Sequence, residues 1–302
     1  MLQIYQDVRQ MTSSYLPLRR ALVAAGAILS IAACASNTSA SKGSTMNQDR
    51  KTKVTDLLKA IESGESAPVA VINPTKYVQH NLGVADGLAG FGAALQALPP
   101  GSAKVNTVRV FQDGDFVFAH TDYNFFGPKI GFDVFRFEDG KIVEHWDNLQ
   151  ITPTQANPSG RSMTDGPTTA TDLDKTATNK QLVAAFIDDI LVNGRMDRIG
   201  QHIVGDNYRQ HNPQIADGLS GLGAALDAMA KAGVAMNYTK VHKVLGEGNF
   251  VLTISEGQFA GKPTAFYDLF RVEAGKIVEH WDTIETIPPG AERKNGNGKF
   301  GF

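Results

Sequence analysis

Two histidines of this chain each stand two residues before an aspartate, in a stretch that occurs twice. Residues 132–147 read FDVFRFEDGKIVEHWD, and residues 267–282 read YDLFRVEAGKIVEHWD. Both stretches alternate apolar and polar residues around a turn signal, as β-hairpins do. Side chains two apart on a strand share a face, so His145 should lie beside Asp147 and His280 beside Asp282.

Comparison of the two stretches indicates the type of turn. A two-residue type I′ turn would place Ala274 at positive φ, which a Cβ disfavours. We therefore expect a three-residue loop that ends in Gly140 or Gly275. The resulting register defines four opposed pairs: Phe137 and Lys141, Phe135 and Val143, Asp133 and His145, and Asp268 and His280.

This register gives each imidazole two carboxylate neighbours on one face of the hairpin. Carboxylates favour a charged imidazole and fix its tautomer, and burial raises the pKa of an aspartate toward that of a useful general base. A buried His–Asp hydrogen bond that only ties two strands fits the spacing equally well. In the first copy the same face carries Phe135, Val143 and Leu149, and the other face carries Ile142, Glu144 and Trp146.

The hairpin belongs to a longer repeat. Residues 77–95 (YVQHNLGVADGLAGFGAAL) recur as residues 208–226 (YRQHNPQIADGLSGLGAAL) at an offset of 131, whereas the hairpins are offset by 135. A stretch rich in Gly, Pro and Thr separates the copies, as linkers do. We therefore expect a first unit at 47–156, a linker at 157–172, a second unit at 173–290 and a tail at 291–302.

Each unit opens with helices and continues with strands. Apolar residues at helical spacing in 179–194 predict a helix that stops at Gly194. Shorter helices are expected at 90–98 and 221–230, and the alternating runs after them predict an antiparallel sheet. Helices followed by such a sheet indicate an α+β fold.

The composition is that of a globular protein, with 42% hydrophobic residues, 20% charged residues and a net charge of −2. No basic cluster suits a phosphate backbone, so no nucleic-acid partner is expected. The sequence has neither a phosphate-binding glycine loop with Lys nor a G-x-S-x-G elbow. A metal site of His80, His145 and Asp147 lacks tight His or Cys spacing, so no metal is expected.

Residues 1–34 have the pattern of a secretory signal peptide. Arg19 and Arg20 precede an uncharged stretch, 21–33, that is too short to span a bilayer. The stretch ends in IAAC, which resembles the bacterial lipobox, where the cysteine is lipidated and becomes the new N-terminus. We expect this modification on Cys34, the single cysteine, with a buried or stray thiol as the alternative.

A chain lipidated in this way would be exported and anchored in the cell envelope. Ala35 rather than Asp after the cysteine resembles lipoproteins of the outer membrane, so its periplasmic face is the expected location. A tether rich in Ser, Thr and Asn, 35–46, would join the anchor to the first unit. Met11 is an alternative start that gives a more compact signal.

Three further histidines are candidates for the site. His80 and His211 stand in the repeated QHN after the first helical region, where helix capping or exposure is the simpler interpretation. His120 ends an alternating run and could point into the same cavity as His145 and Asp147. The second copy has residues 254–256 (ISE) at that position, so the two pockets are not expected to be equivalent.

The blocks YxQHNxxxADGxxGxGAAL and DxFRxExGKIVEHWD resemble the SnoaL-like branch of the nuclear-transport-factor-2-like superfamily, which includes polyketide cyclases and aldol-condensation enzymes. The resemblance spans both copies. It implies two cone-shaped α+β barrels, in each of which a curved sheet wraps a long helix around an apolar pocket. Members dimerise through their sheets, so the copies are expected to pack as an intrachain pseudo-dimer.

The resemblance also implies roles for individual residues. In polyketide cyclases of this family, an aspartate two residues after a histidine removes a proton from a carbon beside a carbonyl. Asp147 and Asp282 would be these bases, and His145 and His280 would orient them or donate to the enolate oxygen. Such catalysis needs no cofactor. The other expected pocket residues are Asp133, Asp268, His80, His211, His120, Tyr77, Tyr208 and Phe135.

These patterns predict a cofactor-independent enzyme of the aldol-condensation, cyclase or isomerase type, acting on a small apolar carbonyl compound. The cell envelope is far from the cytoplasmic assembly of polyketides, which favours an alternative. That alternative is a non-catalytic lipoprotein that binds a hydrophobic small molecule. A third is a pseudo-dimeric scaffold, because this fold does not fix function.

Overall fold

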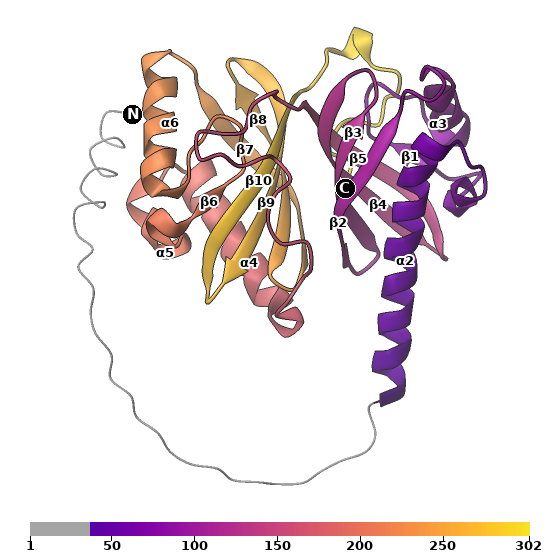
Figure 1. Cartoon of the computed structure of the whole chain (residues 1–302), viewed down its shortest axis with the longest axis horizontal. Coiled ribbons are helices and arrows are strands. Elements are labelled where there is room, and N and C mark those ends of the chain that lie inside the picture. The colour runs from indigo at the N-terminus through magenta and orange to yellow at the C-terminus, as the bar shows by residue number, and fades with distance from the viewer. Residues whose placement is uncertain (1–36) are drawn as a thin grey trace.

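The computed structural model describes the backbone of residues 37–302 and the side chains from residue 49 onward (Figure 1). The predicted signal peptide and Cys34 lie outside the described residues. Most of the expected tether, 37–46, forms the first turns of helix α2 (Asn37–Ser63). These residues include one glycine and no proline, so nothing in this stretch breaks the helix.

Both units have the same order of main elements: a long helix, a short strand, a second helix and four long strands. The first unit comprises α2, η1 (Pro68–Val71), β1 (Val78–Gln79), α3 (Gly87–Gln96), β2 (Lys104–Asp113), β3 (Phe116–Asn124), β4 (Pro128–Glu138) and β5 (Lys141–Ile151). The second comprises η2 (Leu173–Lys175), α4 (Thr176–Phe186), the π-helical η3 (Ile187–Val192), η4 (Met196–Arg198), α5 (Ile199–His202), η5 (Gly205–Asn207), β6 (Arg209–Gln210), α6 (Gly218–Lys231), β7 (Met236–Glu247), β8 (Phe250–Phe259), β9 (Lys262–Glu273), β10 (Lys276–Thr286) and η6 (Gly290–Glu292).

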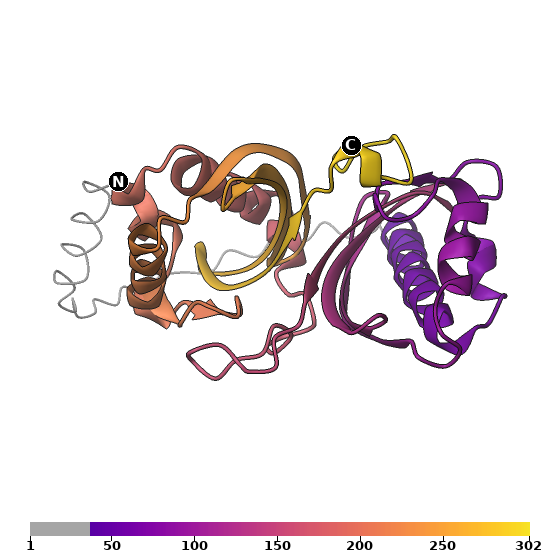
Figure 2. The same cartoon turned by 90° about the horizontal axis from the view of Figure 1, so that it is seen from above.

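Each unit contains one five-stranded sheet, in the order β1-β5-β4-β3-β2 or β6-β10-β9-β8-β7. The short strand pairs in parallel with the last strand, and the other neighbours are antiparallel. Figure 2 shows each sheet curving around the helices of its own unit. The predicted fold class, two tandem α+β units with curved antiparallel sheets wrapped around helices, is confirmed.

The turn between β4 and β5 differs from the prediction. It is a two-residue turn, and both Asp139 and Gly140 have positive φ (49° and 76°). In the second unit Ala274 has the same conformation (φ 48°), followed by Gly275. The predicted three-residue loop is therefore wrong. A Cβ in the left-handed region costs only about 1–2 kcal/mol, and the twist of this turn matches that of the strands it joins.

A β-bulge compensates for the shorter turn. Phe137 pairs with Ile142, but the next pair is Arg136 with Glu144, so Val143 is the extra residue of the bulge. The turn and the bulge each change the predicted register by one residue. Because the two changes add to two, the side chains beyond the bulge keep their predicted face. Ile142 does not keep its predicted face, because the bulge interrupts the alternation of side chains. Its side chain packs in the core of its own unit.

The opposed pairs beyond the bulge are consequently not those predicted. Asp133 lies opposite Asp147, and Phe135 lies opposite His145. The second unit repeats the arrangement, with Asp268 opposite Asp282. Asp133 and His145 are therefore diagonal neighbours, not directly opposed residues, and still share one face.

Within residues 49–302, three apolar clusters stabilise the fold. Two fill the interiors of the separate units, and the third lies between the two sheets. The third includes Trp146 and Trp281, which are fully buried, and Phe111 stacked on Phe250 at 4.5 Å. Asn148 Nδ2 also crosses between the sheets to the carbonyl of residue 283 (2.8 Å). The outer faces of the two sheets thus share one core.

Each unit is also held by a segment that follows the other unit in the chain (Figure 2). The linker arm, residues 157–172, lies along the second unit, where Asn157 Nδ2 donates to the Gln210 carbonyl (2.6 Å). The tail arm, residues 288–302, lies along the first unit, where Asn297 Nδ2 donates to the Gln79 carbonyl (3.0 Å). The two arms therefore cross between the units.

Candidate active site

The inner face of each sheet carries a buried group of two aspartates and one histidine. We call Asp133, His145 and Asp147 the first triad, and Asp268, His280 and Asp282 the second triad. Within each triad the ligating atoms lie within 4.8 Å of one another. The Nε2–Oδ1 distance from His145 to Asp133 is 3.2 Å, and that from His280 to Asp268 is 3.0 Å. None of the six residues is more than 9% exposed, so both triads are shielded from bulk water.

A glutamine from the short parallel strand orients each imidazole. Gln79 lies beside His145 in the β1–β5 pairing. Its Oε1 accepts hydrogen bonds from His145 Nδ1 (2.9 Å) and from the backbone N–H of Asn81 (2.8 Å). An amide oxygen can only accept, so Nδ1 carries a proton and Nε2 faces the aspartate. Gln210 binds His280 in the same way (2.9 Å).

The last aspartate of each triad keeps one oxygen without a hydrogen bond. Asn81 Nδ2 donates to Asp147 Oδ2 (2.5 Å), and Asn212 Nδ2 donates to Asp282 Oδ2 (2.7 Å). The Oδ1 atoms of both aspartates are buried and have no hydrogen-bond partner among the described residues. A buried oxygen of this kind is available to accept a proton or a hydrogen bond from a bound molecule.

A tyrosine hydroxyl satisfies the other aspartate of each triad. Tyr123 Oη donates to Asp133 Oδ2 (2.7 Å), and Tyr238 Oη lies 3.2 Å from both oxygens of Asp268. Tyr123 belongs to β3, whereas Tyr238 belongs to β7, the counterpart of β2. Comparison of the two copies could not reveal these residues, because they come from different strands.

Tyr77 and Tyr208, both predicted pocket residues, are buried beside the triads. Burial, followed by the charges of Asp282 and Asp268, raises the pKa of Tyr208 well above its usual value. The pKa of Tyr77 is raised for the corresponding reasons. Both phenols are therefore neutral and can act as hydrogen-bond donors.

Burial has a large effect on the acid–base properties of the second triad. It raises the pKa of Asp282 to about 6; the charge of His280 opposes this rise and that of Asp268 adds to it. Burial also disfavours charge on His280, but the hydrogen bond to Asp268 and the charge of Asp282 outweigh it and raise the pKa of this imidazole. A carboxyl group that titrates near neutral pH suits general base catalysis.

The predicted pocket residue Phe135 contacts the first triad, because its ring stacks on His145 at 4.6 Å. Phe270 takes the same position against His280 at 4.7 Å. Both rings replace water beside the imidazole with apolar surface. They contribute to the low-dielectric surroundings that shift the pKa values of buried carboxyl groups.

His80 and His211 lie on the opposite side of the sheets from the triads. His80 stacks on Trp146 (4.7 Å) and binds Glu144 (3.0 Å), whereas His211 stacks on Trp281 (4.7 Å) and binds the equivalent glutamate, residue 279 (2.9 Å). The positions of both histidines therefore differ from the expectation that they line the pocket. The preceding residue of each QHN, the glutamine, points inward, so the histidine points outward.

His120 also lies between the sheets and not in the interior of its unit. Its ring stacks on Phe132 (4.3 Å), and Nδ1 accepts a hydrogen bond from Arg109 Nη1 (2.7 Å). Burial and then the charge of Arg109 hold the pKa of His120 well below its usual value. It is therefore a neutral residue of the shared core, which differs from the expected position in the cavity.

The triads have donor types that could bind a metal, but the histidine nitrogens are already engaged. Nδ1 of His145 donates to Gln79, and Nε2 faces Asp133. A ligating imidazole needs a free lone pair on one nitrogen. A metal ion would thus have to displace the hydrogen bond to the aspartate.

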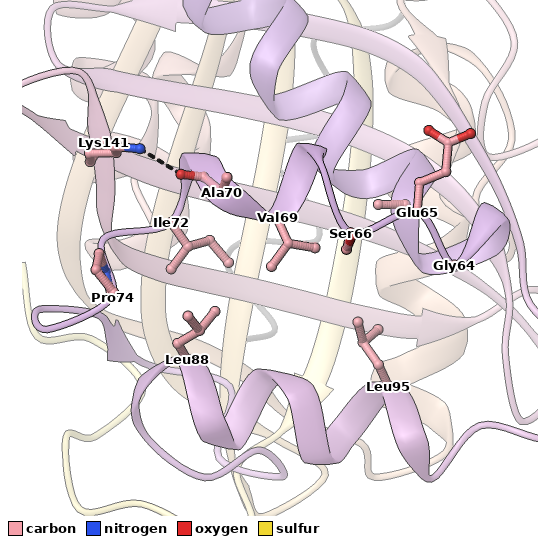
Figure 3. A pocket seen from close by; sticks show the side chains of 11 residues that line it. Gly64, Glu65, Ser66, Val69, Ala70, Ile72, Pro74, Leu88, Leu95 and Lys141 are labelled. Carbon is pink, nitrogen blue, oxygen red and sulfur yellow. Dashed lines mark hydrogen bonds between the residues drawn. The ribbon is translucent and has the colours of Figure 1, made fainter.

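A separate apolar cavity of about 500 Å³ lies in the first unit between α2, η1 and α3 (Figure 3). Leu88 and Leu95 of α3 face Val69 and Ile72 across it. Lys141 at its edge donates to a carbonyl of η1 (2.6 Å). No residue of the triads lines this cavity.

The glutamines and asparagines that surround the triads were not predicted from the sequence. Gln79, Asn81, Gln210 and Asn212 all belong to the repeated QHN, which drew attention only to its histidines. The signal was present, because amide side chains repeated beside a short strand could have suggested orienting groups. The parallel pairing of that strand with the hairpin could not be seen in the sequence.

The described helices include none that combines the length and the apolar character needed to cross a membrane.

Comparison with known proteins gave one family match. The family model of the SnoaL-like domain matches residues 183–280, and no curated protein matches the chain. Among solved structures the chain is similar to TsrD from Streptomyces laurentii, with 21% identity over 36% of this chain and 89% of that one (TM-score 0.29). It is also similar to an LEH-like epoxide hydrolase from M. tuberculosis (21% identity, 37% and 85% covered, TM-score 0.30) and to a SnoaL-like polyketide cyclase from Agrobacterium tumefaciens (13%, 35% and 91%, TM-score 0.29). The family match begins within α4 and ends at His280, so it covers most of the second unit and none of the first.

Proposed function

We propose that the protein is a cofactor-independent acid–base enzyme of the aldol-condensation, cyclase or isomerase type, acting on a small apolar carbonyl compound. One observation carries the proposal. Asp282 is a buried carboxyl group with a pKa of about 6 and an Oδ1 atom that no described residue hydrogen-bonds. Such a group is half ionised near pH 6 and can both take up and return a proton.

The proposed step is removal of a proton from the carbon next to a carbonyl group. Asp282 Oδ1 takes the proton, and the electron pair of the C–H bond moves toward the carbonyl oxygen to give an enolate. Among the described residues the Tyr208 hydroxyl receives only a long contact from Gln210 Nε2 (3.5 Å), so it is a suitable donor to that oxygen. His280 keeps Asp268 in place and need not exchange a proton itself. In the first unit Asp147 and Tyr77 stand at the corresponding positions.

A second function, binding of a hydrophobic small molecule without catalysis, is favoured by the cavity of the first unit. Its volume of about 500 Å³ lies within the range of small-molecule pockets. Its lining by Val69, Ile72, Leu88 and Leu95 suits an apolar ligand. Because the triad residues do not line it, binding there would not depend on the aspartates.

Native mass spectrometry with small-molecule extraction tests both functions. The full-length protein would be compared with the Asp147→Asn/Asp282→Asn double variant and with Leu88→Trp, which fills the cavity. A carbonyl compound that accumulates on the double variant supports the enzyme. A compound lost only from Leu88→Trp supports the binding protein. If none of the three proteins holds a compound, both functions are contradicted and a scaffold is favoured.

We also propose that the protein is exported and anchored by lipid on Cys34 at the periplasmic face of the outer membrane. This proposal is supported by the signal pattern in the sequence. Cys34→Ala is expected to move the protein from the membrane fraction to the soluble fraction. Recovery of wild-type protein in the soluble fraction, without an acylated N-terminal peptide, would contradict it.

A further inference from the structure

The linker arm and the tail arm follow equivalent paths over the two units. In the linker arm the Ser162 carbonyl accepts a hydrogen bond from the QHN histidine of the second unit (2.8 Å). In the tail arm the Gly298 carbonyl accepts one from the QHN histidine of the first unit (2.7 Å). The next residues, Met163 and Lys299, therefore occupy equivalent positions, and both are 5% exposed. A charged side chain thus stands at this position over the first unit, and an apolar one stands over the second.

The side chain that contacts Lys299 is also charged, whereas its counterpart in the other half is neutral. Lys299 Nζ lies 2.6 Å from Glu285 Oε2 on β10. Glu285 also accepts the backbone N–H of Leu149 (3.1 Å), just as Gln150 on β5 accepts that of Ile284 (2.8 Å). Gln150 is thus the counterpart of Glu285. A lysine–glutamate pair stands in one half of the molecule where methionine and glutamine stand in the other.

The ammonium group of Lys299 reaches the first triad. Its Nζ lies 3.7 Å from Asp147 Oδ1, the oxygen that has no hydrogen bond. In the second triad the corresponding oxygen of Asp282 has no such cation, because none of the ion pairs in the described residues joins it to a lysine or an arginine. A buried cation beside a carboxylate favours the ionised form.

The remaining groups around the two aspartates are closely matched. Around Asp147 they are Asp133 of β4, His145 of β5, Asn81, Tyr77, Tyr123 of β3 and Tyr267 of β9. Around Asp282 they are Asp268 of β9, His280 of β10, Asn212, Tyr208, and Tyr238 of β7. Both sets contain one aspartate, one histidine and one asparagine, with three tyrosines around Asp147 and two around Asp282, and all five phenols are neutral because burial raises their pKa values. Lys299 with Glu285 is therefore the main electrostatic difference between the sites.

We propose that Lys299 is a positioning residue that holds Asp147 as an ion-paired carboxylate, so that proton transfer near neutral pH belongs to the second triad alone. This inference rests on the proposed function and assigns it to one of the two sites. The tail arm, which follows the second unit in the chain, thereby controls the site of the first unit. A molecule bound in the first unit meets a fixed negative charge and not an exchangeable proton.

Carboxyl carbon-13 NMR titration of the full-length protein, with assignments from Asp147→Asn and Asp282→Asn, tests this inference without a substrate. In the wild type, Asp282 is expected to titrate near pH 6, whereas Asp147, beside the Lys299 ammonium group, is expected to show no titration step there. The Lys299→Met/Glu285→Gln variant gives the first site the residue types found at the second. It is expected to move the titration of Asp147 toward the pH range in which Asp282 titrates. The reciprocal Met163→Lys/Gln150→Glu variant is expected to lower the midpoint of Asp282 by about one pH unit or more.

Lys299→Arg keeps the cation and is expected to preserve the wild-type titration, which separates a charge effect from simple packing. If either double variant fails to fold, the other double variant and Lys299→Arg still decide the question. Titration of Asp147 together with Asp282 in the wild type would overturn the inference, as would an Asp147 that ignores the loss of Lys299. The expected titrations without any bound or converted compound would contradict the proposed function and leave this assignment intact.

Discussion

Asp282 is buried in a place where its charge is poorly compensated, so its ionisation opposes folding. Its pKa rises from 3.8 in the unfolded chain to about 6 in the native protein. The folded state therefore binds more protons between these values, and stability falls as pH rises from about 4 to 6. At 1.36 kcal/mol per pKa unit, the full loss is about 3 kcal/mol above pH 6.

The Asp282→Asn variant is expected to remove this loss, because an amide stays neutral and can still accept the Asn212 hydrogen bond. We expect the variant to exceed the wild type in unfolding free energy by up to about 3 kcal/mol at pH 8 and to match it near pH 3.5. Urea titrations at both pH values measure this. Asp197→Asn, at an exposed position, serves as the control. An equal gain at both pH values would show that charge is not the cause.

At the scale of elements, the turn and the bulge of each hairpin work together. The two-residue turn alone would reverse the face of every side chain beyond it, and the extra Val143 or Val278 restores that face. The register therefore tolerates a left-handed alanine at the turn. Ala274 in this conformation is the less suitable of the two turn residues, because Asp139 belongs to a type that enters this region more readily.

Ala274→Asn is expected to stabilise the second unit by about 1 kcal/mol, because asparagine relieves the left-handed strain of the turn. Asp139→Asn is the matched control and is expected to change stability by only a few tenths of a kcal/mol. Chemical denaturation of both variants gives the comparison. Destabilisation by Ala274→Asn would mean that its backbone is not in the left-handed region in solution.

At the scale of the whole molecule, the shared core and the crossed arms join two units that each have their own interior. The tail arm closes the first unit with backbone and side-chain hydrogen bonds: Lys294 N donates to the Leu82 carbonyl (2.8 Å), and Asn295 Nδ2 donates to those of Asn81 and Val84 (both 2.8 Å). The ring of Phe302 stacks on Trp146 at 4.3 Å. The first triad therefore depends on residues that follow the second unit.

Removal of the tail arm, residues 288–302, is expected to loosen the first unit selectively. Amide exchange in residues 78–86 should rise by about tenfold or more, because the local opening free energy falls when these contacts are lost. The equivalent residues 209–217, held by the linker arm, should exchange as in the wild type. Hydrogen-exchange mass spectrometry resolves the two segments. Equal loss of protection in both would show that the arms stabilise the pair as a whole.

How far the sequence predicts the site depends on the range of the interaction. Alternation of side chains along a strand placed His145 and Asp147 on one face without knowledge of the pairing partner. The same rule brought Asp133 to that face, although the predicted register was two residues away from the observed one. The predicted face was still right, because the shorter turn and the bulge each shifted the register by one residue.

The sequence by itself determined two tandem α+β units and the residues of both triads, because repeats and strand periodicity are local properties of the chain. The tertiary structure alone decided the orientation of each imidazole by Gln79 or Gln210, and the placement of Lys299 beside Asp147. It also placed His80, His120 and His211 on the opposite side of the sheets from the triads. These features depend on contacts between residues that are remote in the chain, and only the packing of complete elements brings such residues together.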